Sequence, residues 1–186
     1  MNFCLWLTGL PVSGKSTIAG KLEKKLAATD NEIVLLNLDS IRRLITPSPK
    51  YNDEERSIVY RSLVIMAKLL VEKGGKNVII DATGNRREYR ELARQLLPEF
   101  AEVYVKCPLE TCRSREASRK NPDVQKNLYK KAANGRLQGR LPGVASPYEE
   151  PLHPELIIDS NVFTPDKSTA IITKYIKSRW NLSHPS

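Results

Sequence analysis

Two glycines, a lysine and a serine near the start of the chain have the spacing of a phosphate-binding loop. Segment 9–17 fits the pattern G-x-x-x-x-G-K-[ST], with a strand-like apolar run before it and helical apolar spacing after it. Glycines let backbone N–H groups surround a polyphosphate, and a helix N-terminus adds partial positive charge. A glycine-rich turn that matched by accident would lack these flanks. We therefore predict a nucleoside triphosphate site formed by Gly9, Leu10, Pro11, Val12, Ser13, Gly14, Lys15, Ser16 and Thr17.

Two side chains of this loop have distinct expected roles. Lys15 is expected on the β- and γ-phosphates, which makes it a candidate catalytic residue. Ser16 is expected to hold Mg²⁺ through its hydroxyl. The predicted cofactors are ATP and Mg²⁺.

Two acids follow two further predicted strands. Asp39 comes after the apolar run 33–37, and Asp81 comes directly after 78–80. Ligands gather at the carboxyl ends of parallel strands, so both acids are expected near the phosphate loop. Asp39 is the second candidate catalytic residue, because it can orient an acceptor hydroxyl, although it can also merely cap a helix. Asp81 is expected to bind substrate and metal, the alternative being a loop acid without a role.

Three arginines are candidates for binding the phosphates of a substrate. Arg42 lies one helical turn after Asp39, on the same face. Arg56 and Arg61 lie five residues apart on a predicted long helix, about 140° apart around its axis. They can contact one ligand only if it lies along the helix, and solvated arginines are the alternative.

The elements that must position these residues alternate along the chain. Strands are expected at 3–7, 33–37, 78–80, 101–105 and 156–158, and helices at 53–73, 86–97, 109–116 and 166–179. In the long helix the residues expected to face inward are Ile58, Leu63, Met66, Leu69 and Leu70. The region 117–150 is expected to be irregular. The pattern predicts a three-layer α/β/α fold of the P-loop kinase type, around a central, mostly parallel sheet.

Length, charge and cysteine content narrow the classes of protein. The 186 residues fit one domain spanning 1–186, and no apolar run approaches the ~20 residues of a membrane span. Three unevenly spaced cysteines and the lack of a secretory signal favour a cytoplasmic protein. The net charge is +9, and many of the basic residues lie in 112–140. This concentration indicates a basic lid that faces phosphates, over about 115–142. Nucleic acid is disfavoured as a partner because aromatic residues do not alternate with the basic ones.

Several motifs, in order from residue 3 to about 160, resemble the adenylylsulfate kinases. Beyond the phosphate loop they include Asp39-Ser40-Ile41-Arg42, Cys107-Pro108-Leu109-Glu110-Thr111-Cys112, Leu128-Tyr129-Lys130-Lys131-Ala132 and Pro147-Tyr148-Glu149-Glu150-Pro151. That family transfers the γ-phosphate of ATP to the 3′-hydroxyl of adenosine 5′-phosphosulfate (APS), which gives PAPS. The resemblance implies that Asp39 is the acid of the catalytic region. It also implies that Arg42, Arg56 and Arg61 bind the substrate and that Lys130 is the lysine of the lid.

The departures from the family pattern concentrate where the acceptor would bind. Asn37-Leu38-Asp39 stands in place of Asp-Gly-Asp, so the first acid is lost. Tyr51 keeps one aromatic ring, but Leu141 stands where the family has a second ring, and Val59 replaces an asparagine. Stacking contributes about 1–3 kcal/mol per base, so the loss of one ring weakens the selection of adenine. Asn85-Arg86 lies near the family's Ser-Pro-x-Arg, and the lid is longer by several residues between Arg115 and Leu128.

These departures leave the acceptor open. An APS kinase is the leading hypothesis, which makes a small nucleotide the expected substrate. A homodimer is left open as the assembly. A kinase that acts on a cytidine diphosphate derivative is the nearest alternative. A polynucleotide-end kinase and a nucleotide-binding module without catalysis are the other two. The intact Lys15, Ser16, Asp39 and Asp81 count against the last of these.

Overall fold

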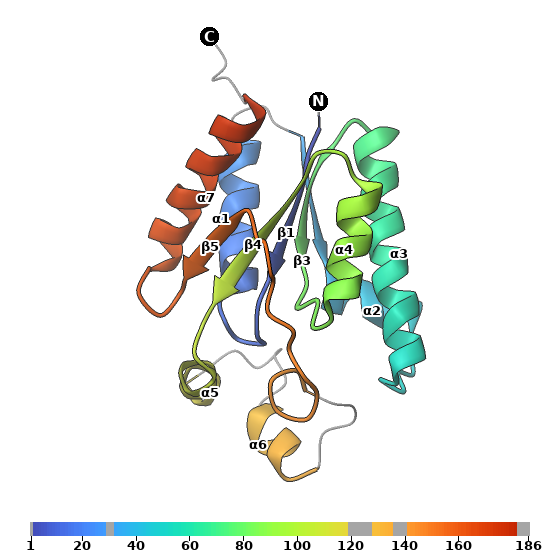
Figure 1. Ribbon diagram of the computed structural model, residues 1–186, viewed down its shortest axis with the longest axis vertical. Helices are drawn as coiled ribbons and strands as arrows, with labels where there is room; N and C mark the ends of the chain where they lie inside the picture. The colour runs from blue at the N-terminus through green and yellow to red at the C-terminus, as the bar shows by residue number, and fades with distance from the viewer. Residues whose placement is uncertain (1, 29–31, 119–127, 136–140, 182–186) are drawn as a thin grey trace.

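A five-stranded parallel sheet forms the centre of the computed structural model, which describes residues 2–28, 32–118, 128–135 and 141–181. The strands are β1 (Cys4–Thr8), β2 (Ile33–Asn37), β3 (Asn77–Asp81), β4 (Phe100–Lys106) and β5 (Leu156–Asp159), in the spatial order β2-β3-β1-β4-β5 (Figure 1). Every pairing among them is parallel. All five strands therefore end at the same edge of the sheet, and the expected α/β fold is confirmed.

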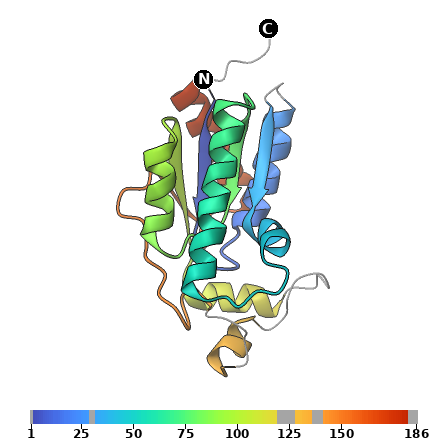
Figure 2. The ribbon, with the colours of Figure 1, turned by 90° about the vertical axis from the view of Figure 1, so that its right-hand side faces the viewer.

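Helices cover both faces of this sheet. They are α1 (Lys15–Ala27), α2 (Leu38–Ile45), α3 (Asp53–Glu72), α4 (Arg87–Leu96), α5 (Leu109–Ala117), α6 (Leu128–Ala133) and α7 (Pro165–Trp180). Helices α1 and α7 pack together on one face, and α3 and α4 pack together on the other. Figure 2 shows α5 and α6 beyond the strand ends, on the side where the loops after β1, β2 and β3 emerge. None of the helices in the described part of the chain has the length and apolar character that crossing a bilayer requires.

Alternating strand residues build two separate cores. Cys4 and Trp6 of β1 face the core under α3 and α4, whereas Leu5 and Leu7 face the core under α1 and α7. All four side chains are fully buried. This explains why β1 is apolar at every position, as expected for a parallel strand that is covered on both faces.

Helix α3 differs from the predicted inward face. Leu63 is fully buried as expected, and Met66 and Leu70 pack partly buried against the same core, but Ile58 and Leu69 are about half exposed. The buried face instead carries Val59 and Tyr60, together with Arg56, Val64, Ala67 and Val71. The sequence prediction followed only the large aliphatic residues, whereas the helix turns its more mixed face, with the Tyr60 ring, toward the sheet. The region 117–150 also differs, since it contains α6.

The segment 147–155 is fastened across α4 and β4 by a buried ion cluster. Arg90 of α4 pairs with Glu102 of β4 at 2.5 Å, and both side chains are at most 3% exposed. Arg90 also donates hydrogen bonds to the carbonyls of Gly84 and Glu149, the latter at 2.7 Å. Arg94 contacts both Glu102 and Glu155. Burial raises the pKa of Glu102 above its ordinary value, although the two arginines lower it.

We predict that Arg90→Met destabilises the protein by about 3–5 kcal/mol, because it leaves Glu102 buried without its main counter-charge. Urea denaturation measures the free energy of unfolding. The double variant Arg90→Met/Glu102→Leu is expected to recover part of the loss, since it removes both charges. Recovery is expected to be incomplete because the bonds to Gly84 and Glu149 remain broken. Equal losses for the single and double variants would contradict the role of the ion pair.

Candidate functional site

The phosphate loop joins β1 to α1 and has a backbone shape that fits its glycines. Gly9 has φ 149° and Gly14 has φ 107°, in the range that side chains rarely adopt. A Cβ atom at Gly9 would also lie 2.4 Å from the carbonyl oxygen of Val105. The N-cap of α1 is Gly14, which offers no capping side chain. The first-turn N–H groups of α1 therefore keep their capacity to bind an anion.

Side chains from three elements occupy the carbonyl groups of this loop. The Lys15 ammonium donates to the carbonyls of Gly9 at 2.9 Å and Leu10 at 2.8 Å. The Tyr129 hydroxyl of α6 donates to the Pro11 carbonyl at 2.7 Å. Arg115 of α5 donates to the Ser13 carbonyl at 3.2 Å. With its acceptors used in this way, the loop has backbone donors to offer to a ligand.

Asp81 ends β3 beside the phosphate loop and contacts Asn37. Its side chain is buried, and one oxygen accepts a 2.8 Å hydrogen bond from the Asn37 side-chain amide. The neighbouring strand β1 leads directly into the phosphate loop. Among the described residues, no three His, Cys, Asp or Glu side chains form a metal-binding group. A cation here would need phosphate and water oxygens to complete its coordination, which is typical of Mg²⁺.

The charges of Asp39, Arg42 and Arg56 act on one buried tyrosine, Tyr60. Burial raises the pKa of Tyr60 to about 12; the charges of Arg42 and Arg56 lower it and that of Asp39 raises it. All three charged groups are therefore within electrostatic reach of this phenol. The Tyr60 hydroxyl also accepts a hydrogen bond from the Gly84 N–H at 2.9 Å, which fixes the loop after β3. Asp39 is exposed in the first turn of α2, where it is open to a substrate.

Glu55 fixes the backbone and ring of Tyr51. Tyr51 has φ 56°, a left-handed conformation that is unfavourable for a residue with a side chain. One Glu55 oxygen accepts hydrogen bonds from the N–H groups of Lys50 at 2.5 Å and Tyr51 at 3.2 Å. The other lies 3.7 Å from Arg42, whose guanidinium carbon is 5.6 Å from the centre of the Tyr51 ring. Arg56 donates to the Tyr51 carbonyl at 3.3 Å.

Tyr51 and Arg56 line a pocket of about 680 Å³. Lys50 and Arg86 add two further cations to its wall, and Asn85 of the loop after β3 adds an amide. Arg86 is paired with Asp53 at 2.8 Å. The pocket thus combines an aromatic ring with three cations, which suits a ligand that has both a flat ring and anionic groups.

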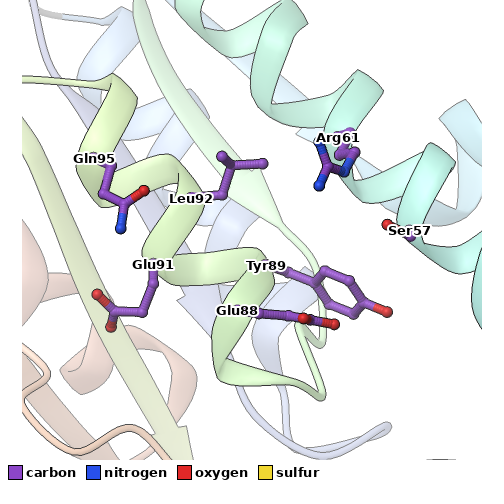
Figure 3. Close-up of a pocket in the computed structure, with 7 residues that line it drawn as sticks. All are labelled: Ser57, Arg61, Glu88, Tyr89, Glu91, Leu92 and Gln95. Atoms are coloured by element: carbon purple, nitrogen blue, oxygen red, sulfur yellow. The ribbon is translucent and has the colours of Figure 1, made fainter.

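Arg61 lies in a different place from Arg56. It lines a second, smaller pocket of about 330 Å³ between α3 and α4. Figure 3 shows Arg61 and Ser57 on α3 facing Tyr89 and Leu92 on α4. Their spacing of five residues places the two arginines about 140° apart around α3, as anticipated. They do not line the same pocket.

The described part of the lid packs on the phosphate loop through apolar residues. Leu141 is 7% exposed and clusters with Cys107, Cys112 and Tyr129, against which Leu10 also packs. Leu141 was expected to bind the substrate, and in this structure its side chain contributes to a small apolar core. Lys130 is exposed on α6. Lid positions 119–127 and 136–140 lie outside the described residues.

Sequence reasoning missed the residues that support the site. Glu55 follows Asn52 by three positions, and Asn52 caps α3 by accepting the Glu55 N–H at 2.8 Å. That spacing is the pattern of a capping box and is visible in the sequence. Tyr60 was missed in the same helix because only aliphatic residues and Met66 were assigned to its inward face. Arg115 and Tyr129 reach the loop across more than 100 positions, a distance over which local patterns carry no information.

Comparison with known proteins agrees with this geometry. The sequence model described as adenylylsulphate kinase matches residues 1–159. The adenylyl-sulfate kinase of Bacillus licheniformis is 38% identical over 178 residues, which cover 94% of this chain and 85% of the relative. That of Thermodesulfovibrio yellowstonii is 37% identical over 183 residues, with coverages of 97% and 86%.

A solved structure shows the same similarity in three dimensions. The APS kinase of Mycobacterium tuberculosis, in complex with AMPPNP and APS, has a TM-score of 0.81 at 27% sequence identity. The match covers 95% of this chain and 98% of that one.

We predict that Glu55→Ala lowers the free energy of unfolding by about 1–3 kcal/mol, because the N–H groups of Lys50 and Tyr51 each lose a hydrogen bond worth about 0.5–1.5 kcal/mol net. Glu54→Ala is the matched control, since Glu54 lies in the same first turn of α3 and is exposed. Both variants remove one negative charge from the helix N-terminus, so they share any effect on the helix dipole. Chemical denaturation of the two proteins gives the comparison. Similar losses would show that the bonds to Lys50 and Tyr51 do not matter.

Proposed function

The chain belongs to the adenylylsulphate kinase family, and from that premise we propose that it is an ATP-dependent kinase which phosphorylates the 3′-hydroxyl of APS to give PAPS. The observation that carries the proposal is the close grouping of two half-sites at one edge of the sheet. The phosphate loop with Lys15 forms the donor half. Asp39, Arg42, Arg56 and Tyr51 form the acceptor half, in which both arginines contact Tyr51.

In the donor half, the loop N–H groups and Lys15 would bind the phosphates of ATP. Lys15 already lies over the loop through its bonds to Gly9 and Leu10. Its ammonium has three N–H donors and would share them between these carbonyls and phosphate oxygens. The ammonium then stabilises charge on the β/γ bridge as the bond to the γ-phosphorus breaks, and it needs no large reorganisation to do so.

Mg²⁺ fits the oxygen donors of this half. Ser16 is exposed at the start of α1, and Asp81 offers a carboxylate at the end of β3. A hydroxyl, one carboxylate and phosphate oxygens are the ligands that Mg²⁺ commonly takes at kinase sites. When bound, Mg²⁺ neutralises charge on the transferring phosphoryl group. We assign Ser16 and Asp81 as the residues that hold it.

In the acceptor half, Asp39 would accept a hydrogen bond from the attacking hydroxyl and take its proton as the oxygen bonds to the γ-phosphorus. The leaving group is ADP. Arg42 and Arg56 would bind the phosphosulfate, and the Tyr51 ring would stack on the base. Arg61 has a weaker claim, because it lines the other pocket. Lys130 would contribute from the lid, and exclusion of water by the lid would limit ATP hydrolysis.

One observation favours a second acceptor, a cytidine diphosphate derivative. Leu141 is buried in the lid, so Tyr51 is the single ring on the wall of the larger pocket in the described part of the chain. One-sided stacking selects a purine less strongly than a sandwich of two rings. The pocket's three cations would serve either nucleotide.

A cytoplasmic location and a homodimer complete the proposal. The three cysteines are free thiols, as is usual in a reducing compartment. Ile58, Ile65 and Leu69 are each about half exposed on α3, and a second copy could cover them. Sedimentation analysis measures the oligomeric state, and a purely monomeric protein would contradict the proposed homodimer.

The proposal is tested by incubating the protein with ATP–Mg²⁺ and separate acceptors, with the products identified by mass. The panel contains APS, CDP derivatives and a 5′-hydroxyl oligonucleotide. We expect APS to gain one phosphoryl group and ADP to form in equal amount. Turnover on a CDP derivative with only background on APS would decide for the second acceptor. No transfer to any of them would oppose a kinase.

We predict that Asp39→Asn lowers kcat and kcat/KM together by about 10²–10⁴, because a general base acts chiefly in the transition state. The KM for ATP is expected to stay close to that of the unaltered enzyme. Initial rates at varied ATP and acceptor concentrations separate these constants. A rise confined to the KM for ATP would move Asp39 into the donor half.

A further inference from the structure

We propose that Asn37 is a positioning residue that holds the carboxylate of Asp81 and the helix carrying Asp39 in one fixed arrangement. The inference rests on the proposed function, since it concerns the same metal–nucleotide site. Asn37 is the position at which the family resemblance places an acid, so a neutral amide stands here in place of a carboxylate.

A single side chain makes both connections. Asn37 ends β2 and is the N-cap of α2, where its amide oxygen accepts the N–H of Ser40 at 3.0 Å. Its amide nitrogen donates to Asp81 Oδ2 at 2.8 Å. The two residues are direct partners in the parallel pairing of β2 with β3. The amide thus links the end of one strand to the start of the helix that follows the other.

The geometry demands a short side chain that carries both a donor and an acceptor at its tip. Aspartate could still cap α2, but it would bring a second carboxylate to hydrogen-bond distance of Asp81 and offer no donor. Serine could also cap α2, but its side chain is shorter and would not span both groups. Asparagine meets both requirements, and its neutral amide leaves one negative charge at this point.

The consequence concerns the position of two acids together. The hydrogen bond from Asn37 occupies one lone pair of the Asp81 carboxylate, and it fixes the directions in which the remaining lone pairs point. Asp39 lies two residues after Asn37, in the first turn of the helix that Asn37 caps. Residues that hydrogen-bond a metal-binding carboxylate commonly change metal affinity or activity by about 10–100-fold when they are replaced.

The test compares Asn37→Ser with Asn37→Asp by measuring Mn²⁺ affinity. Mn²⁺ replaces Mg²⁺ because its unbound ion gives an electron paramagnetic resonance signal. The protein is first saturated with a non-hydrolysable ATP analogue, and Mn²⁺ is then titrated. Both variants keep an N-cap, so similar melting temperatures are expected. We expect Asn37→Ser to weaken Mn²⁺ binding by about tenfold, because Asp81 loses its partner. Asn37→Asp is expected to tighten it, because a second carboxylate joins the site.

The change in Asn37→Ser decides between positioning and capping alone. A residue that only capped α2 would leave the Mn²⁺ affinity of Asn37→Ser unchanged, and that result would overturn the inference. Asn37→Asp adds a carboxylate whatever the role of the amide, so its tighter binding reports that position 37 lies at the metal site. Asn52→Asp is the matched control for that charge, since Asn52 is also a helix N-cap and gains the same charge away from Asp81. Its Mn²⁺ affinity is expected to equal that of the unaltered protein. If Asn37→Ser fails to fold, Asn37→Gly replaces it, because glycine is also accepted at an N-cap.

The same titration separates this inference from the function on which it depends. An unaltered protein that binds neither the analogue nor Mn²⁺ would overturn the proposed function, and the inference with it. Binding by the unaltered protein, with Asn37→Ser indistinguishable from it, would overturn the role of Asn37 alone.

Discussion

The phosphate loop can present its backbone donors to an anion only if its carbonyl groups have donors of their own. Lys15, Arg115 and Tyr129 supply them from α1, α5 and α6. Two of these three helices belong to the region beyond the strand ends, so the lid is part of the architecture of the loop. The same requirement explains why the loop, the end of β4 and α6 share a small apolar cluster. Other features at this edge of the sheet also hold the irregular phosphate loop in place.

The acceptor side is built by a different kind of interaction. Charged groups there form ion pairs that are buried or partly buried, and each pair joins different elements of the fold. Arg90 and Glu102 fasten the segment after the lid, whereas Glu55 joins Arg42 to the backbone before α3. Such pairs add little net stability, because desolvation offsets much of their attraction. Their effect is geometric, since a buried charge tolerates few arrangements. The donor side is thus shaped by backbone hydrogen bonds and the acceptor side by ion pairs.

Much of the fold could be predicted from the sequence, because it depends on local patterns. Apolar runs and turn residues located the strands and most helices, and the spacing of Gly9, Gly14 and Lys15 defined the loop. The inward face of α3 could not be predicted from aliphatic residues, since Tyr60 and Arg56 lie on it. The placement of Leu141 depends on contacts across the lid. The pairing of Asn37 with Asp81 depends on the register of two strands 44 residues apart, which local sequence does not specify.

The backbone of Tyr51 has a consequence for how this position can change over generations. A left-handed conformation costs an ordinary residue about 1–2 kcal/mol, and glycine nearly nothing. Selection for stability alone would therefore favour glycine here, whereas the ligand binding that we propose for the ring would retain tyrosine. A population released from the need for this activity would drift toward glycine at position 51 while the buried core stayed constant. The identity of this one residue would then record, in any descendant of this chain, whether its pocket is still in use.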